Sequence, residues 1–300
     1  MEKRERIIQT IAHLTMLTGA LCASCSSNGM HDEDKINNIT LKAVNGKTGI
    51  YITKAPFQSG NICDIYITGQ NGTNSCPGNS FVTGCADASG NIIPERQIQL
   101  PSGLYDFYLV SANCPQPTGL MFREGVAGNL LNGVDYIWGS VKSIFVDSDT
   151  TLALIFNRLC SKLDINIKSL SSIEDFSVKK VLLSLPDESL QTICLINGVI
   201  EPYCGEGILT EIEGTGAERS FIILPKEGRT KIVVEIEGKT DGNNVISKEF
   251  NTILETRFKA GYSYNINLEI VNNGINLLSL ISTPWRIVEN HNVFNLIKIL

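Results

Sequence analysis

Leu163-Asp164-Ile165-Asn166-Ile167-Lys168 alternates strictly between apolar and polar side chains. Successive side chains of a β-strand point to opposite faces of its sheet, so the three apolar residues of this segment share one face. Residues 231–237 repeat the pattern, with an Ile-Val-Ile face. One apolar and one polar face per strand is typical of antiparallel sheets that bury a single face. These two segments therefore predict a β protein with a layered core.

The rest of the sequence fits the same class. Short segments rich in Val, Ile, Leu, Tyr and Phe recur between clusters of turn-forming residues. We expect strands at residues 39–44, 49–54, 62–68, 96–100, 105–111, 141–146, 151–156, 162–168, 178–185, 192–196, 220–224, 231–237, 245–250, 262–271 and 275–281. No segment reads as a long helix, and residues 125–132 are the best candidate for a helical turn. Many short strands at this spacing predict an all-β fold built of β-sandwiches.

Two segments resemble one another across the sequence. Residues 102–110 and 260–268 each begin with Gly103 or Gly261, continue with an aromatic residue, and then alternate as a strand. Glycine allows a tight turn into such a strand, although this start is common in any β protein. The alternative is two sandwiches of similar construction. We then expect an N-terminal sandwich at residues 39–158 and a C-terminal sandwich at residues 159–300, each of ordinary domain size.

Charge and histidine content exclude several functions. The formal net charge of −6 argues against a nucleic-acid-binding surface, which needs clustered Lys and Arg. Only three histidines occur, His13, His31 and His291. His13 lies in a segment that we expect to be removed, and the other two lie near opposite ends of the remaining sequence. This distribution disfavours a histidine-based catalytic triad or a multi-histidine metal site. We expect no enzyme activity, no cofactor and no nucleic-acid partner.

The first residues have the pattern of an export signal. Residues 1–6 are basic and residues 7–21 are mostly apolar, which is shorter than a membrane span. Small residues before Cys25 and a Ser/Asn stretch after it resemble a bacterial lipobox, and Cys22 is the fallback acceptor. We therefore expect a lipoprotein signal peptide at residues 1–24 and a flexible polar tether at residues 25–38. The alternative is an ordinary secretory signal with two incidental cysteines.

Seven further cysteines follow the signal, so at least one has no partner within the chain. An exported protein meets an oxidising compartment, in which some of them can pair. The plausible local pairs are Cys76–Cys85 and Cys194–Cys204, although spacing alone does not fix the connectivity.

Four motifs together resemble the fimbrillin family of Bacteroidetes, the Mfa-like and FimA-like lipoprotein subunits of type V pili. They are the lipobox at Cys25; residues 100–108 with 135–140; residues 152–167, which include Asn157-Arg158; and residues 259–268 with the later Pro284-Trp285. Each motif is loose, and the family often has histidine where Asn157 stands. The resemblance implies two tandem transthyretin-like β-sandwich domains. It also implies an outer-membrane lipid anchor and a structural or adhesive role in a surface fimbria.

The resemblance also implies assembly with other fimbrial subunits by strand exchange. In that family, loss of an N-terminal strand opens an apolar groove, and a terminal strand of a neighbour fills it. Residues 292–300 have the composition of a donor strand, with apolar side chains at Val293, Phe294, Leu296, Ile297, Ile299 and Leu300. The alternative is an ordinary last strand of the second sandwich.

Stalk subunits of that family are trimmed after a basic residue beyond the first strand, typically an arginine. No arginine occurs between Arg6 and Arg96 here, so lysine is the available residue. Lys47 follows the turn pair Asn45-Gly46 and is the first candidate, and Lys54 is the second. Without trimming, we expect an anchor or tip role.

Two other functional classes remain as alternatives. A monomeric surface lipoprotein that binds glycans or host ligands would present an exposed aromatic platform. Trp138 and Trp285 are the candidates for it, although we interpret both as core residues. A secreted hydrolase is the least supported class, because no active-site motif is present.

Overall fold

The computed structural model describes residues 36–44, 54–55, 57–69, 80–169, 174–239, 245–271 and 274–285. Strands make up most of these residues, and the helical content among them is a single 3-10 turn at Glu188–Leu190. The predicted all-β sandwich fold is therefore confirmed. Within the same residues, no helix has the length and apolar character needed to cross a membrane. The division into domains at residue 158 stays a prediction.

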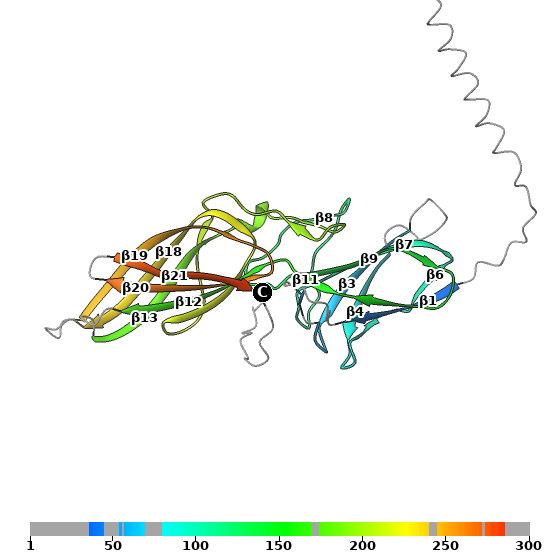
Figure 1. Cartoon of the computed structure of the whole chain (residues 1–300), viewed down its shortest axis with the longest axis horizontal. Helices are drawn as coiled ribbons and strands as arrows, with labels where there is room; N and C mark the ends of the chain where they lie inside the picture. The colour runs from blue at the N-terminus through cyan, green and yellow to red at the C-terminus, as the bar shows by residue number, and fades with distance from the viewer. Residues whose placement is uncertain are drawn as a thin grey trace, which may run out of the picture. The chain divides into compact units, whose positions relative to one another are not determined.

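Residues before 159 form a ten-stranded sheet with the order β10-β1-β5-β4-β3-β7-β9-β11-β2, in which β6 also pairs with β1 (Figure 1). The strands are β1 (Ile36–Ala43), β2 (Lys54–Ala55), β3 (Ile62–Gly69), β4 (Ser80–Ala86), β5 (Asn91–Pro94), β6 (Ile98–Pro101), β7 (Gly103–Ser111), β9 (Ile137–Val146), β10 (Thr150–Leu154) and β11 (Phe156–Arg158). Strands from both ends of this order, including β10 and β11, contribute to one apolar core. The sheet therefore closes around its own apolar face, as a sandwich does.

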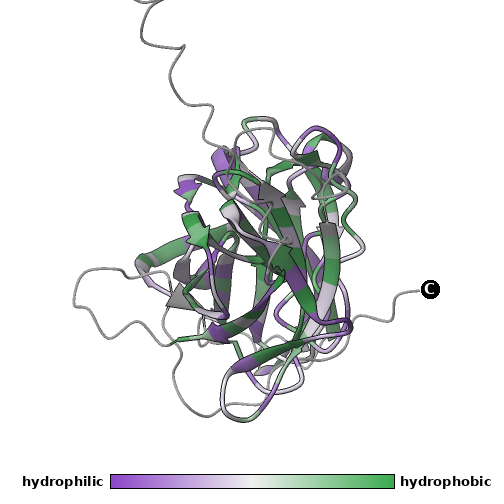
Figure 2. Cartoon of the chain, turned by 90° about the vertical axis from the view of Figure 1, so that its right-hand side faces the viewer, coloured by the Kyte–Doolittle hydropathy of each residue, from purple (hydrophilic) through white to green (hydrophobic). Residues whose placement is uncertain are grey.

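Residues after 158 form two four-stranded sheets that enclose a second core. One sheet has the order β17 (Glu218–Ile223), β12 (Ser161–Ser169), β20 (Tyr262–Val271), β21 (Gly274–Pro284). The other has the order β16 (Ile208–Glu211), β13 (Glu174–Leu185), β18 (Lys226–Lys239), β19 (Val245–Phe258). The predicted apolar faces of β12 and β18 both line this core. Figure 2 shows hydrophobic and hydrophilic stretches alternating along strands of the chain. Alternation in the sequence thus predicted which face each strand buries.

A third, small sheet joins residues from before and after position 158. It contains β15 (Val199–Ile200), β14 (Ile193–Cys194) and β8 (Val126–Ala127). Around it lies a third apolar group, which we call the junction cluster: Tyr66, Tyr108, Val110, Leu120, Ala127, Leu130, Tyr136, Leu159, Cys160, Ile193, Leu195, Ile200, Leu224 and Trp285. These side chains come from both parts of the chain, so the cluster packs the two parts against each other.

The predicted helical turn at residues 125–132 is wrong. Val126 and Ala127 form β8 instead, while Gly125 (φ 79°) and Asn129 (φ 59°) adopt left-handed backbone conformations that a right-handed helix excludes. Ala127 and Leu130 are buried in the junction cluster, which holds this loop extended. The helical turn forms at Glu188–Leu190, where the Asp187 carboxylate accepts a hydrogen bond from the Ser189 N–H.

Two strand predictions also need correction. The expected strand at 151–156 is interrupted at Ile155, because β10 pairs with β1 whereas β11 pairs with β9 and β2. Strand β4 was not expected, because its segment contains Gly84 and small residues. A Cβ at Gly84 would lie 2.8 Å from Ile92 Cγ2, so the close packing of β4 on the core requires glycine there.

The expected Cys194–Cys204 pair is wrong, since both thiols are free. Cys194 is held in β14 opposite Val199, whereas the chain continues past Gly198 to Tyr203, which bridges to Lys226. Cys85 is also free, and its expected partner Cys76 lies outside the described residues.

Candidate assembly site

Strand β1 has neighbours along both of its edges. Residues 39–43 pair in parallel with residues 150–154 of β10. On the other edge, residues 36–39 pair antiparallel with β6, and Leu41 and Lys42 pair antiparallel with β5. If β1 left, two rows of backbone hydrogen-bonding groups would lose their partners, which is the condition under which a sheet accepts a new strand.

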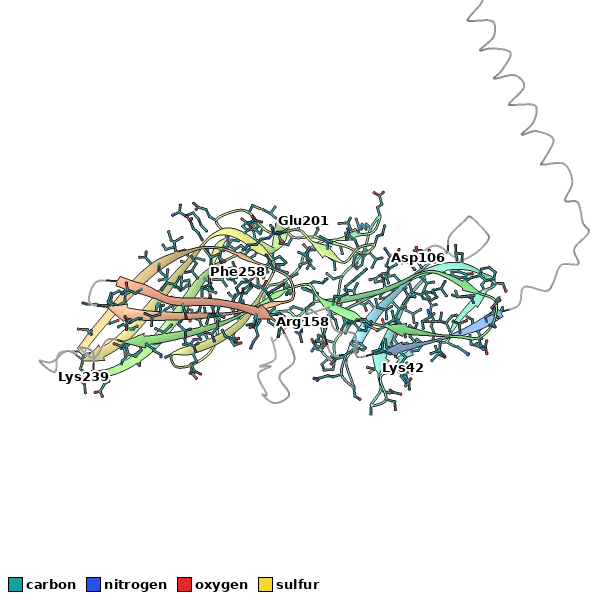
Figure 3. The ribbon with its side chains drawn as sticks, viewed as in Figure 1. Lys42, Asp106, Arg158, Glu201, Lys239 and Phe258 are labelled. Carbon is teal, nitrogen blue, oxygen red and sulfur yellow. The ribbon has the colours of Figure 1, made fainter. Side chains whose placement is uncertain are left out.

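The side chains of β1 alternate as its sequence predicts. Asn37, Ile39 and Leu41 point into the molecule and are at most 4% exposed. Thr40 and Lys42 are exposed, and Lys42 is labelled in Figure 3. Burying one Ile and one Leu side chain contributes about 3–6 kcal/mol to stability. The strands that pair with β1 contribute their own buried apolar residues to the same core, namely Ile92, Ile98, Leu100, Leu152 and Leu154. Removal of β1 would therefore expose an apolar groove.

The two ends of β1 differ in polarity. Near its start, the Asn37 amide donates to the Leu100 carbonyl and to the Ser102 hydroxyl, both at 3.5 Å. On the outer face, the Asn38 N–H and side-chain amide donate to the Asp149 carboxylate at 2.8 and 3.2 Å. Farther along, the sites of Ile39 and Leu41 are apolar. The groove therefore has one polar site followed by two apolar sites, an order that can specify register.

Most of the site residues predicted from sequence lie outside the described residues. These are Cys22, Cys25, Lys47, Val293, Phe294, Leu296, Ile297, Ile299 and Leu300. Lys54 begins β2, and its backbone pairs with Asn157 of β11. A protease that cuts after Lys54 must therefore first separate β2 from β11.

Trp285 is a core residue, as we interpreted it, whereas Trp138 is only partly buried against the junction cluster. Trp285 is 8% exposed in the junction cluster, and the Trp138 indole N–H donates to the Leu195 carbonyl at 2.8 Å. Neither ring offers the exposed platform that a glycan-binding role would need. The described residues also contain no group of three His, Cys, Asp or Glu side chains placed to hold a metal ion.

An ion pair that no sequence motif predicted lies at the junction. Arg158, at the end of β11 (Figure 3), bonds to the Asp135 carboxylate, and both side chains are at most 5% exposed. The guanidinium also stacks on Trp285, with 3.8 Å between its central carbon and the ring centroid. Asn113 donates to the same Asp135 oxygen at 2.7 Å. Burial raises the pKa of the Asp135 carboxyl, while Arg158 and Asn113 act against that rise.

This contact brings three of the quoted motifs together in space. Residues 135–140, Asn157-Arg158 and Pro284-Trp285 meet through the Asp135–Arg158 pair and the Arg158–Trp285 stack. In the sequence, Arg158 is visible as a charged residue at the end of an apolar strand. The sequence does not indicate that its partner is Asp135.

Comparison with known proteins gives one family by sequence and one fold by structure. The sequence profile of a family described as fimbrillin-like matches residues 52–285. No curated protein is significantly similar in sequence.

Among solved structures, a candidate cell adhesion protein from Bacteroides uniformis ATCC 8492 is 18% identical, with a TM-score of 0.54 over 83% of this chain and 99% of that one. Another, from Bacteroides ovatus ATCC 8483, is 14% identical, with a TM-score of 0.52 over 85% and 99%. A fimbrial protein from Bacteroides vulgatus ATCC 8482 is 10% identical, with a TM-score of 0.53 over 83% and 99%. At these identities the similarity is one of fold.

Proposed function

The chain belongs to the fimbrillin-like family, and on that premise we propose that it is a structural or adhesive subunit of a cell-surface fimbria that assembles by β-strand exchange. The family is one of fimbrial and adhesion proteins rather than of enzymes. Its fimbrial nature places the protein at the cell surface.

The position of β1 is the observation that carries strand exchange. One N-terminal strand is inserted between β10 and the β5–β6 edge, and it fills an apolar groove with only a few side chains. A single cut beyond residue 44 would leave β1 held by non-covalent contacts alone. A strand from another subunit can then replace it with the same backbone hydrogen bonds. Residues 292–300 are the proposed donor, with other fimbrial subunits as partners.

The proposed cut falls at Lys47 or Lys54. The backbone pairing of Lys54 in β2 favours Lys47, because proteolysis requires an extended and unpaired backbone. If neither bond is cut, β1 stays in place and the groove stays filled. The subunit would then serve as an anchor or a tip, not as a repeating stalk unit.

Fibres isolated from the cell surface test this function. We expect a ladder of oligomers that resists SDS at moderate temperature, because an exchanged strand is released only by unfolding. N-terminal mass spectrometry of the same material should find Thr48 or Ala55 if the subunit forms the stalk. Fibres whose subunits all begin at a lipid-modified Cys25 would contradict the stalk role, and the absence of any ladder would contradict strand exchange.

The proposed lipid anchor makes a separate prediction. Cys25→Ser should abolish lipidation and release the protein from the membrane fraction, because the acyl chains are attached through this thiol. Labelling with a fatty-acid analogue and fractionation measure both effects, and Cys22→Ser serves as the matched control. Unchanged membrane association of Cys25→Ser would assign the lipid to Cys22 or reject lipidation.

Binding of glycans by a monomer is the alternative role. Trp285 is buried, and Trp138 is partly buried with its indole N–H bonded to the Leu195 carbonyl, which argues against the aromatic platform on which that alternative depended. Adhesion to host or bacterial ligands remains compatible with a fimbrial subunit.

A further inference from the structure

The groove of β1 constrains the register of whatever strand fills it. In order along the strand, it offers a polar site filled by Asn37 and two apolar sites filled by Ile39 and Leu41. A shift by one residue would turn every buried side chain to the solvent face. A shift by two would leave a polar side chain in an apolar site, or an apolar one beside the Ser102 hydroxyl.

Two registers of residues 292–300 match a polar–apolar–apolar order. In the first, Asn295 takes the place of Asn37, and Ile297 and Ile299 take the two apolar sites. In the second, Asn292 takes the polar site, followed by Phe294 and Leu296. The two registers differ by three residues and so bury opposite faces of the donor.

Side-chain volume and charge separate the two registers. The first puts Ile297 where Ile39 lies and Ile299 where Leu41 lies, which nearly conserves volume in sites at most 4% exposed. Its Lys298 takes the exposed position of Thr40. The second register forces a phenyl ring into the site of an isoleucine.

Lys298 gives a further reason to reject the second register. It would occupy the half-buried position of Ala43, whose N–H donates to the Gly90 carbonyl. Ala43 packs partly buried against the apolar side chains of the first core, so a lysine there would lose part of its hydration.

The order of the polar and apolar sites in the groove also selects the direction of the donor strand. A donor that runs as β1 runs pairs antiparallel with β6 and in parallel with β10. If the donor ran in the opposite direction with Ile297 in the middle site, Asn295 would occupy the apolar site of Leu41. An amide without a partner in that site is unfavourable, so the polar site selects both direction and register.

We propose, resting on the strand exchange proposed above, that residues 295–300 of a second copy of this chain fill the groove in the direction of β1, with Asn295 in the Asn37 site. Asn295 is then the residue that specifies register, and the partner at this site is another copy of the same subunit. In this register, Leu296 lies where Asn38 now lies, opposite Gln99 of β6.

Cross-linking in surface fibres tests the register directly. Asn38 and Gln99 face each other on the outer face, and the Gln99 amide donates to the Asn38 carbonyl oxygen at 3.3 Å. Facing residues of antiparallel strands are close enough for a disulfide or a short dithiol cross-linker. Cells that express the full chain with Gln99→Cys and Leu296→Cys should yield linked copies, identified by mass spectrometry of the joined peptides. Gln99→Cys with Val293→Cys is the matched control, because Val293 faces Gln99 only in the rejected register.

We expect the Leu296→Cys pair to cross-link at least about tenfold more than the Val293→Cys pair, since a wrong register buries a lysine or an unpaired amide. A ladder whose copies join through residue 293, or equally through both residues, would overturn the register and leave strand exchange intact. Fibres without any ladder would overturn strand exchange, and the register with it.

A second pair of variants tests the same register by changing one buried and one exposed position of the donor strand. Ile297→Asp should abolish the ladder, because it puts a carboxylate in the Ile39 site. Leu296→Lys should retain it, because that position is on the outer face, where Asn38 now donates to the Asp149 carboxylate. The reverse result would assign the rejected register.

Discussion

Arg158→Met should destabilise the protein by about 3–5 kcal/mol, because it leaves the buried Asp135 carboxylate without its opposite charge. That is a large part of the free energy of unfolding of a typical domain, which is about 5–15 kcal/mol. Both side chains are at most 5% exposed, so solvent offers little compensation. Urea unfolding of the parent and the variant measures the difference.

The loss should also depend on pH. Without Arg158, burial raises the pKa of the Asp135 carboxyl further above its unfolded value of about 3.9. When folding raises the pKa of a carboxyl group, the protein keeps its full stability below the unfolded pKa. It loses stability as the pH rises from the unfolded pKa through the folded pKa. The stability deficit of Arg158→Met should therefore grow from about pH 4 upward. A deficit that shrinks over that range would contradict this account of the pair.

Two controls isolate the buried charge. Arg257→Met removes one partner of the half-exposed Arg257–Glu227 pair, whose atoms lie 3.4 Å apart, and it should cost at most about 1 kcal/mol. The double variant Asp135→Leu with Arg158→Met should recover much of the lost stability, because it removes both charges from the interior. If the double variant is as unstable as Arg158→Met, packing against Trp285 rather than charge pairing explains the loss.

Leu41→Ala should loosen β1 by about 2–5 kcal/mol, because it empties a fully buried site between Ile92 and Leu152. That range corresponds to an increase from about thirty-fold to several thousand-fold in the population with β1 released. Hydrogen exchange of the β1 backbone amides in the full chain measures this opening. Thr40→Ala, at the neighbouring exposed position, should change it little. Equal protection of β1 in both variants would mean that Leu41 does not anchor the strand in the groove.

Sequence alone determined the fold class and the face that each regular strand buries. The alternation in residues 163–168 and 231–237 directly gave the buried sides of β12 and β18. The expected strand at 39–44 overlaps β1, whereas residues 36–38, which include the buried Asn37, were not part of that expectation. Side chains alternate between the two faces of a strand, and one face of these sheets is exposed to solvent. The polarity of each residue therefore indicates whether it is buried or exposed.

Tertiary structure decided everything that depends on which segments meet. No strand was expected around Gly84, which packs against Ile92 within β4, and the expected helical turn at 125–132 is held extended by the junction cluster. The Asp135–Arg158 pair joins residues whose local sequence gives no sign of one another. Likewise, β1 becomes a candidate assembly site only because β10 lies along one edge and β6 along the other, at positions distant in sequence. Pairing partners and buried charges are properties of contacts, and contacts between distant residues are fixed only when the whole chain packs.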